Sequence, residues 1–164
     1  MCLPGGCSND EPSAAEATAV VQYIDALATV NAGQAMRNQN IDRTAIDETS
    51  DESFVVFLDE FMDSFRIYRE DLVTLTPPEQ FRDSRDDMVV AIDVLLDADT
   101  SLRDQIATGE QTDEALQARI ELFEASQSAF IEVERLCRVM EHEADRIDGL
   151  SCPWIVEAGQ PTPQ

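Results

Sequence analysis

Lysine is absent from this 164-residue chain, and histidine occurs once. All 11 basic residues are arginine, and they face 34 acidic residues, for a formal net charge of −23. Clustered basic residues are needed to bind a phosphate backbone, so this balance argues against nucleic acid as a direct partner. It equally disfavours docking on an anionic membrane surface through protein charge. Two interpretations of the acidity stay open: solubility in a salty habitat, or a surface that attracts cations or a basic partner.

Long apolar runs and strand signals are also lacking. No stretch approaches the roughly 20 apolar residues that a membrane-spanning helix needs, and no β-branched alternation lies between hairpin turns. From residue 13 to 148, apolar side chains instead recur at intervals of three and four, which is the helical period. The clearest run comprises Phe54, Leu58, Phe61, Phe65, Tyr68, Leu72 and Leu75. The sequence therefore predicts an all-α protein.

Four amphipathic segments follow from the helix caps and helix breakers in the chain. The first begins at Ser13 and ends between Gly33 and Ile46. The second begins with a capping box formed by Thr49 and Glu52. Each segment is expected to run for about 25 to 35 residues, or ~38–52 Å at the helical rise of about 1.5 Å per residue.

The stretch Thr76–Glu79 separates the second segment from the third. Its two prolines end one helix, and its Thr and Glu predict a capping box for the next. Gly109 stops the third segment, and the fourth runs from near Thr112 to Gly149. The core stripe of the third segment is expected to comprise Phe81, Met88, Ile92, Leu95, Leu102 and Ile106. That of the fourth segment is expected to comprise Leu116, Ile120, Phe123, Phe130, Val133, Cys137, Met140, Ala144 and Ile147.

Short connections between the later segments force antiparallel neighbours. The expected fold is an antiparallel up-down-up-down four-helix bundle over residues 13–156, in a single domain. Residues 1–12 are expected to form a flexible tether, and residues 157–164 are expected to form a disordered tail.

Cysteines occur only near the two ends of the chain, at positions 2, 7, 137 and 152. The stretch Leu3–Ser13 resembles the junction of a bacterial lipoprotein, with a Leu and small residues, then the lipidated Cys, then a polar tether. By that resemblance Cys7 is the acylated residue, Cys2 belongs to the removed signal, and most of the signal peptide lies upstream of Met1. The alternative is that Cys2 and Cys7 pair with each other or elsewhere.

The C-terminal part of the chain carries a second resemblance. A helix cysteine, Cys137, is followed by Cys152 after a short acidic and apolar turn, and the stretch Pro77–Glu79 starts a preceding helix. This pattern is similar to that of uncharacterised secreted bacterial helical-bundle proteins. The resemblance implies a secreted helical bundle and no known activity.

Pairing of Cys137 with Cys152 depends on the path of the chain after the fourth segment. If that helix continues to Gly149, Cys137 lies about three turns from its end, ~16–18 Å away, whereas the Cα atoms of a disulfide lie within ~7 Å. Cys152 therefore reaches Cys137 only if the chain reverses and runs back along the helix, which Gly149 permits. We expect this disulfide; the alternative is two buried reduced cysteines that fill core space.

Side chains that could support catalysis or metal binding are few. His142 lies between Arg138 and Arg146 and is expected on a solvated helix face. The stretch Asp97–Ser101 mimics the start of a calcium-binding loop, but Leu102 stands where that loop requires glycine. We therefore predict no catalytic set, no metal site and no cofactor, and expect a protein that is not an enzyme.

Arg85 and Asp99 fall on the apolar frame of the third segment and are weak candidates for a ligand site. The alternative for both is a salt bridge at the edge of the bundle. The function expected is that of a non-enzymatic extracytoplasmic bundle, secreted or membrane-anchored as a lipoprotein. It would act as an interaction or structural module with a protein partner in the cell envelope, touching the membrane only through the lipid. The alternative is a module that binds a cation or small ligand, with weak binding of divalent cations.

Overall fold

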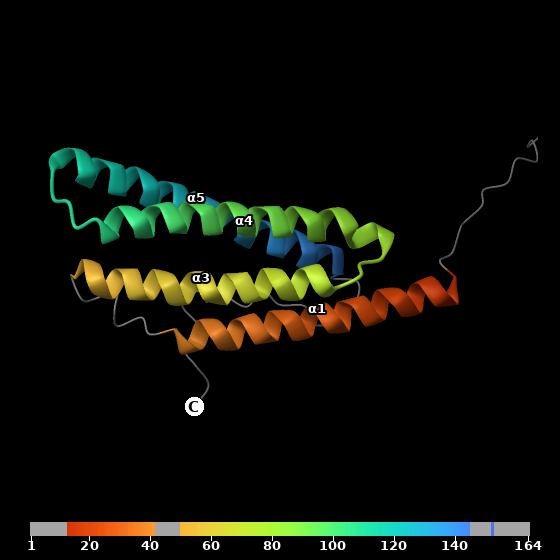
Figure 1. The fold of residues 1–164 in the computed structure, drawn as a ribbon. Coiled ribbons are helices and arrows are strands. Elements are labelled where there is room, and N and C mark those ends of the chain that lie inside the picture. Colours follow the sequence, from red (N-terminus) through yellow and green to blue (C-terminus); the bar gives the residue numbers. More distant parts are fainter. Residues whose placement is uncertain (1–12, 42–49, 145–151, 153–164) are drawn as a thin grey trace, which may run out of the picture.

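The computed structural model describes residues 13–41, 50–144 and 152. These residues form four helices and no strand: α1 (Ala14–Asn40), α3 (Asp51–Thr74), α4 (Glu79–Ala107) and α5 (Asp113–Ala144). Consecutive helices run antiparallel, with α1 against α3, α3 against α4 and α4 against α5 (Figure 1). The predicted antiparallel four-helix bundle is confirmed.

Local hydrogen bonds set several of the helix ends. Ser13 and Glu16 form a capping box at the start of α1: the Glu16 N–H donates to Ser13 Oγ at 3.3 Å, and the Ser13 N–H donates to Glu16 Oε2 at 2.7 Å. Gly109 follows α4 with a φ of 66°, and its N–H donates to the Ile106 carbonyl at 3.0 Å. Glycine adopts this left-handed conformation without the steric cost of a Cβ, so the predicted stop at this position is confirmed.

The starts of α3 and α4 differ from the two capping boxes expected from the sequence. Ser50 caps α3, with its Oγ accepting a backbone N–H of the first turn at 3.2 Å, and Thr49 lies outside the described residues. α4 begins at Glu79 with Pro78 as its N-cap and no side-chain cap. A capping box needs the acidic residue in the third helical position. Glu79 is in the first position, so its predicted pairing with Thr76 is wrong.

The main core lies where all four helices meet. Each helix contributes fully or nearly fully buried side chains, such as Leu27 from α1, Phe65 from α3, Ile92 from α4 and Val133 from α5. A second, smaller cluster joins α3 to α4 nearer the other end of the molecule and comprises Leu58, Met62, Leu102 and Ile106. The apolar stripes predicted for α3 and α4 account for most of the positions that these two helices contribute to the two clusters.

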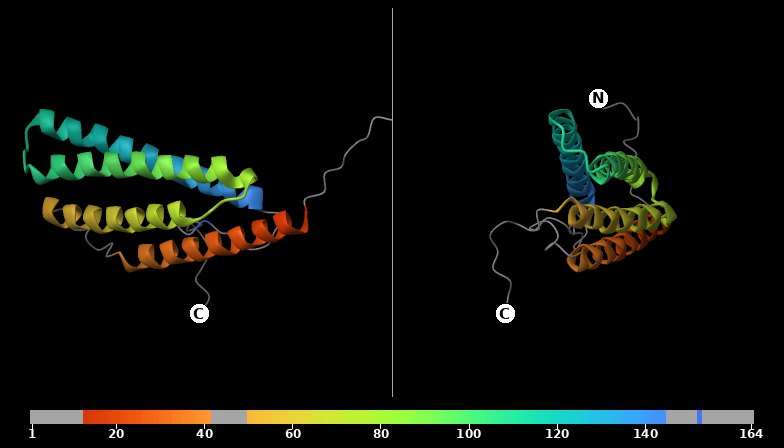
Figure 2. Two further views of the ribbon diagram at one scale, coloured as in Figure 1. Left: turned by 45° about the vertical axis from the view of Figure 1, so that its right-hand side comes forward. Right: turned by 60° about the vertical axis from the view of Figure 1, so that its left-hand side comes forward.

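α5 diverges from α1 and α3 over its N-terminal half. Figure 2 shows the start of α5 held away from these two helices, whereas its C-terminal end lies close to them. Leu116, Ile120 and Phe123 are therefore 41%, 53% and 43% exposed. The prediction that they belong to the core is wrong, because no other described helix covers this face of α5 near its start.

Several predictions fall on residues outside the described ranges. These include the tether (1–12) with its candidate lipidation site Cys7, the continuation of the first helix beyond residue 41, and the tail (157–164). The boundaries of the predicted bundle at residues 13 and 156 therefore stay predictions.

Candidate functional site

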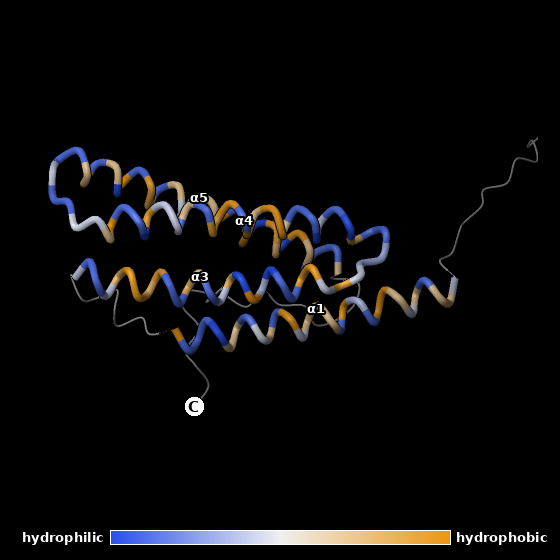
Figure 3. The backbone as a smooth tube through the Cα atoms, in the orientation of Figure 1, coloured by the Kyte–Doolittle hydropathy of each residue, from blue (hydrophilic) through white to orange (hydrophobic). Residues whose placement is uncertain are grey.

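The inner face of α1 changes from apolar to polar along the helix. Ile24 and Leu27 are buried in its first half, and Asn31, Gln34 and Asn38 are buried at the same spacing in its second half. Figure 3 shows the predominantly hydrophilic C-terminal half of this helix. Apolar periodicity does not identify these amides as core residues because they are polar, although the sequence shows their spacing of three and four.

The buried amides bond to two polar side chains of α3. Gln34 Nε2 donates to Asn38 Oδ1 at 3.1 Å and to Ser64 Oγ at 3.0 Å. Ser64 Oγ donates in turn to Asn38 Oδ1 at 3.1 Å, and the Tyr68 hydroxyl donates to Asn31 Oδ1 at 2.9 Å. We call these five residues the α1–α3 polar seam. Hydrogen bonds buried in this way fix how one helix sits against the other.

An ion pair closes the exposed edge of the polar seam. Arg37 Nε donates to Gln34 Oε1 at 3.1 Å, and Arg37 Nη2 donates to Asp71 Oδ2 at 3.3 Å. Within the described part of the chain, no polar side-chain atom of the seam is both buried and without a hydrogen-bond partner. The seam therefore acts in α1–α3 packing, because its groups are committed to one another.

Asp99 is a buried carboxyl between α4 and α5. Its side chain is 1% exposed, Ser126 Oγ donates to its Oδ1, and its Oδ2 has no partner among the described residues. Burial raises the pKa of Asp99 to about 6, an effect that the hydrogen bond from Ser126 partly offsets. This carboxyl therefore keeps its proton to a higher pH than an exposed aspartate does.

Arg85 lies at the other end of α4 and caps the end of α3. Its Nη1 donates to the carbonyls of Leu72 and Leu75 at 3.5 and 3.3 Å, and its Nε forms an ion pair with Asp86 at 2.7 Å. A guanidinium suits the unpaired carbonyls at a helix C-terminus. The two ligand-site candidates are 14 positions apart in α4, which corresponds to about 21 Å along the helix, so the structure does not bring Arg85 and Asp99 together.

Further polar groups lie near Arg85, at the end of the bundle where α4 begins. Ser84 Oγ donates to Glu143 Oε2, which joins α4 to α5. The buried Tyr23 hydroxyl has no hydrogen-bond partner among the described residues. Burial raises the pKa of Tyr23 to about 12, although Arg85 acts in the opposite direction. The phenol therefore stays protonated at neutral pH and is unsuited to act as a general base.

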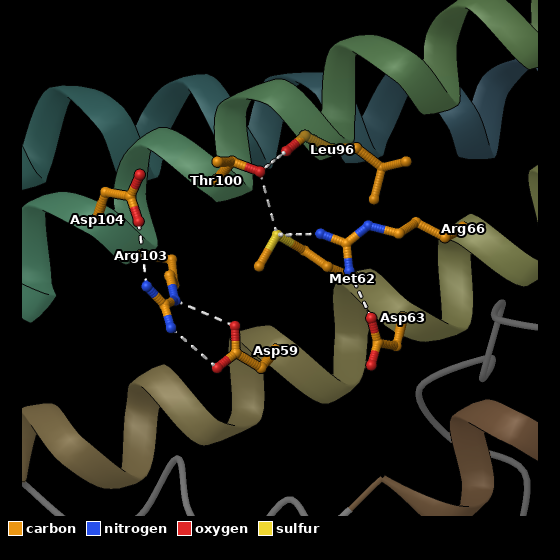
Figure 4. A network of polar contacts seen from close by, with 8 residues as sticks. All are labelled: Asp59, Met62, Asp63, Arg66, Leu96, Thr100, Arg103 and Asp104. Carbon is orange, nitrogen blue, oxygen red and sulfur yellow. Dashed lines mark hydrogen bonds and ion pairs between the residues drawn. The ribbon is translucent and has the colours of Figure 1, made fainter.

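Polar contacts also join α3 to α4 along their exposed edges (Figure 4). Arg103 makes a two-pronged contact with Asp59, from Nε to Oδ1 at 3.1 Å and from Nη2 to Oδ2 at 3.3 Å. Beside it, Thr100 Oγ1 lies 3.5 Å from the Met62 sulfur. Exposed pairs of this kind contribute at most about 1 kcal/mol each, so they orient the two helices more than they stabilise the fold.

A disulfide joins Cys137 to Cys152, with Cα atoms 5.9 Å apart. Both cysteines belong to the main core, at 1% and 8% exposure. The predicted pairing is confirmed, and the chain therefore returns to α5 after that helix. Residues 145–151 lie outside the described ranges.

Metal-binding groups do not converge in the part of the chain that the structure describes. No group of three or more His, Cys, Asp or Glu side chains is placed there to hold an ion. His142 is exposed on α5, as predicted. The stretch Asp97–Ser101, which mimics a calcium loop, lies within α4 and is helical. A helix cannot wrap its carboxylates around one ion as that loop does.

A groove of about 320 Å³ lies between α4 and α5. Apolar side chains contribute most of its lining, and three charged residues complete it. The lining comprises Asp87, Val90, Ala91, Val94, Ala129, Glu132, Arg135 and Leu136. We call this feature the α4–α5 groove. Sequence analysis did not predict it, because a groove depends on how two helices are placed relative to each other.

The chain matches no protein-family model, no curated protein and no solved structure. The sequence also predicted that no segment is apolar and long enough to span a membrane. None of the helices in residues 13–41 and 50–144 combines the length and apolar character needed to cross a membrane.

Proposed function

We propose that this chain is a non-enzymatic, extracytoplasmic interaction module of the cell envelope. The observation that carries the proposal is the disulfide between Cys137 and Cys152 in the main core. Disulfides persist in secreted and envelope proteins and are rare where cellular thiols are kept reduced. A disulfide that holds the C-terminal part of the chain on α5 suits a small module that works outside the cytoplasm.

The described polar groups support binding rather than catalysis. The α1–α3 polar seam is engaged internally, Arg85 caps a helix, and Asp99 bonds to Ser126 deep between two helices. Catalysis of acyl or proton transfer needs an acid, a base or a nucleophile around one accessible point. The accessible feature is instead the apolar α4–α5 groove, which suits contact with another protein.

A cell-fractionation experiment tests the location. The gene would be expressed in a bacterial host together with the DNA upstream of Met1, and the product of each fraction would be digested without reduction. We expect the protein in an extracytoplasmic fraction and a peptide crosslinked through Cys137 and Cys152. A cytosolic product with both thiols free would contradict the proposal.

Lipid anchoring through Cys7 is the second part of the proposal and has its own test. A Cys7→Ser variant is expected to move from the membrane fraction to the soluble extracytoplasmic fraction, because it cannot be acylated. A Cys2→Ser variant is the matched control and should stay with the membrane. If the Cys7 variant stays there as well, the protein has no anchor at that residue.

A further inference from the structure

The α4–α5 groove is an apolar surface that no described helix covers. Val90 and Val94 lie one helical turn apart on α4 and are 61% and 54% exposed. Beneath them, Ala91 and Ala129 form a floor of small side chains, each 7% exposed. Small residues between two helices allow a third helix to approach both of them closely. An approaching helix with an apolar face would bury both valines.

We propose that the α4–α5 groove binds an amphipathic helix, rich in arginine or lysine, from a partner protein. This inference rests on the proposed interaction module and names the chemistry of its partner. The apolar face of the helix would lie on Val90 and Val94, with residues spaced three and four apart as in other helix-in-groove complexes. Its basic residues would lie along the edge of the groove that carries Asp87.

Charge is the observation that selects a basic partner. Asp87 lines the groove on the α4 side and Glu132 lines it on the α5 side. The one cation of the lining, Arg135, donates to both carboxylate oxygens of Glu132, from Nε and Nη2 at 2.7 Å each. Arg135 and Glu132 thus neutralise each other, which leaves the Asp87 carboxylate and the field of a molecule with a net charge of −23. Such a field attracts cations and speeds their association.

The same charge disfavours the other occupants of the groove. A second copy of the chain would bring another 23 negative charges to an acidic surface. The chain's own segments outside the described ranges also lack the basic residues that would complement the acidic surface. Residues 1–12 and 153–164 contain no basic residue, and residues 42–49 and 145–151 contain one arginine each and more acids than that.

Binding of a designed peptide to the full-length oxidised chain tests the proposal. The probe is a fluorescent peptide of about 18 residues, long enough to form a helix on binding, with leucine and alanine on one face and arginine elsewhere. One control has the same composition in an order that destroys the apolar face, and the other replaces each arginine by glutamate. We expect saturable binding, measured by fluorescence anisotropy, for the first peptide alone. Equal binding of the reordered peptide would overturn the proposal, as would no binding of the first peptide.

Two variants locate the binding site on the protein. Val94→Arg places bulk and positive charge in the groove and is expected to weaken binding by at least about tenfold, as loss of a central contact does. Val73→Arg, at an equally exposed valine of α3 (50% exposed), is the matched control and should bind like the wild type. Equal losses in the two variants would show that the peptide reads overall charge, which would overturn the groove assignment.

A measurement on the wild-type chain makes the result independent of how the variants fold. Addition of the peptide should shift the methyl resonances of Val90 and Val94 in an NMR spectrum and leave those of Val73 unchanged. Shifts confined to Val73 would also overturn the proposal. Purified protein is used throughout, so failure here leaves the proposed location untouched, and a cytosolic location would leave peptide binding untouched.

Discussion

Asp99 is a carboxyl group whose chemistry is changed by its burial in the fold. Its position on the frame of α4 marked it as unusual, and the structure shows a 1% exposed carboxyl with one bonded and one unbonded oxygen. Burial of a carboxylate disfavours its charged form, which is why the pKa of Asp99 rises to about 6. Neither the depth of burial nor Ser126 as its partner could be predicted from sequence, because both depend on where α5 lies.

The raised pKa of Asp99 makes its contribution to stability depend on pH. Below about pH 3 the carboxyl is mostly neutral in both the folded and the unfolded chain. As the pH rises through 6, the folded chain must ionise a buried group and stability is lost. Asp99→Asn should therefore be more stable than the wild type at pH 8, by up to about 3 kcal/mol, and most of this difference should be lost near pH 4. Denaturant unfolding at several pH values measures it.

The matched control for this prediction is Asp97→Asn, which removes an exposed carboxylate from the same helix. Subtracting its effect corrects for the loss of one negative charge from a strongly acidic molecule. A difference between Asp99→Asn and the wild type that stays constant from pH 4 to pH 8 would show that Asp99 does not titrate in this interval.

At the scale of single elements, the α1–α3 polar seam decides how the first helix packs. Two helices with amides at core positions can pack against each other in fewer ways than two helices with apolar side chains there. The reason is that the hydrogen bonds of the amides form in one register only. Here Gln34 reaches Ser64, and Asn31 accepts from Tyr68. We infer that the seam holds α1 in a single register along α3, a role that apolar contacts alone would perform less selectively.

A double-mutant cycle tests the seam. Ser64→Ala and Gln34→Ala should each lower the free energy of unfolding, the latter by about 2 kcal/mol, because buried partners lose their hydrogen bonds. The double variant should lose less than the sum of the two, with a coupling of about 1 kcal/mol. Ser84→Ala is the control, since this buried serine of α4 bonds to Glu143 instead. Its effect should add to that of Gln34→Ala, and additivity in both cycles would argue against the seam.

Helix prediction from the apolar period succeeded where neighbouring helices are held close and failed where they are not. In α4 the stripe from Phe81 to Ile106 is buried as predicted. In α5 the same kind of stripe is exposed at Leu116 and Ile120 and buried at Val133. The period states which face of a helix is apolar, but it carries no information on whether another helix reaches that face.

At the scale of the whole molecule, the charge of −23 is the dominant property. Most of the described arginines are already paired, such as Arg37 with Asp71 and Arg119 with Asp51. The remaining carboxylates repel one another in the compact fold more than in the expanded unfolded chain. The molecule is therefore expected to be stabilised by screening.

Salt should accordingly raise the melting temperature at neutral pH. Raising the ionic strength from about 0.01 M to 1 M shortens the screening length from ~30 Å to ~3 Å, which weakens the repulsion between acidic residues. We expect an increase of several degrees in thermal unfolding followed by circular dichroism. At a pH below the usual range of Asp and Glu, the increase should largely disappear because the carboxylates are protonated. A fall in melting temperature with salt at pH 7 would mean that ion pairs outweigh the repulsion.

The sequence by itself determined the helical class, the antiparallel order of the helices and the stop at Gly109, because these follow from local periodicity, short connections and glycine's backbone freedom. It also indicated the Cys137–Cys152 disulfide, which requires only that the chain turn back. The tertiary structure alone decided the divergence of α5, the partners of the seam amides and the α4–α5 groove. Each of these is a relation between helices distant in the chain, set by how their side chains pack, and no local pattern specifies it.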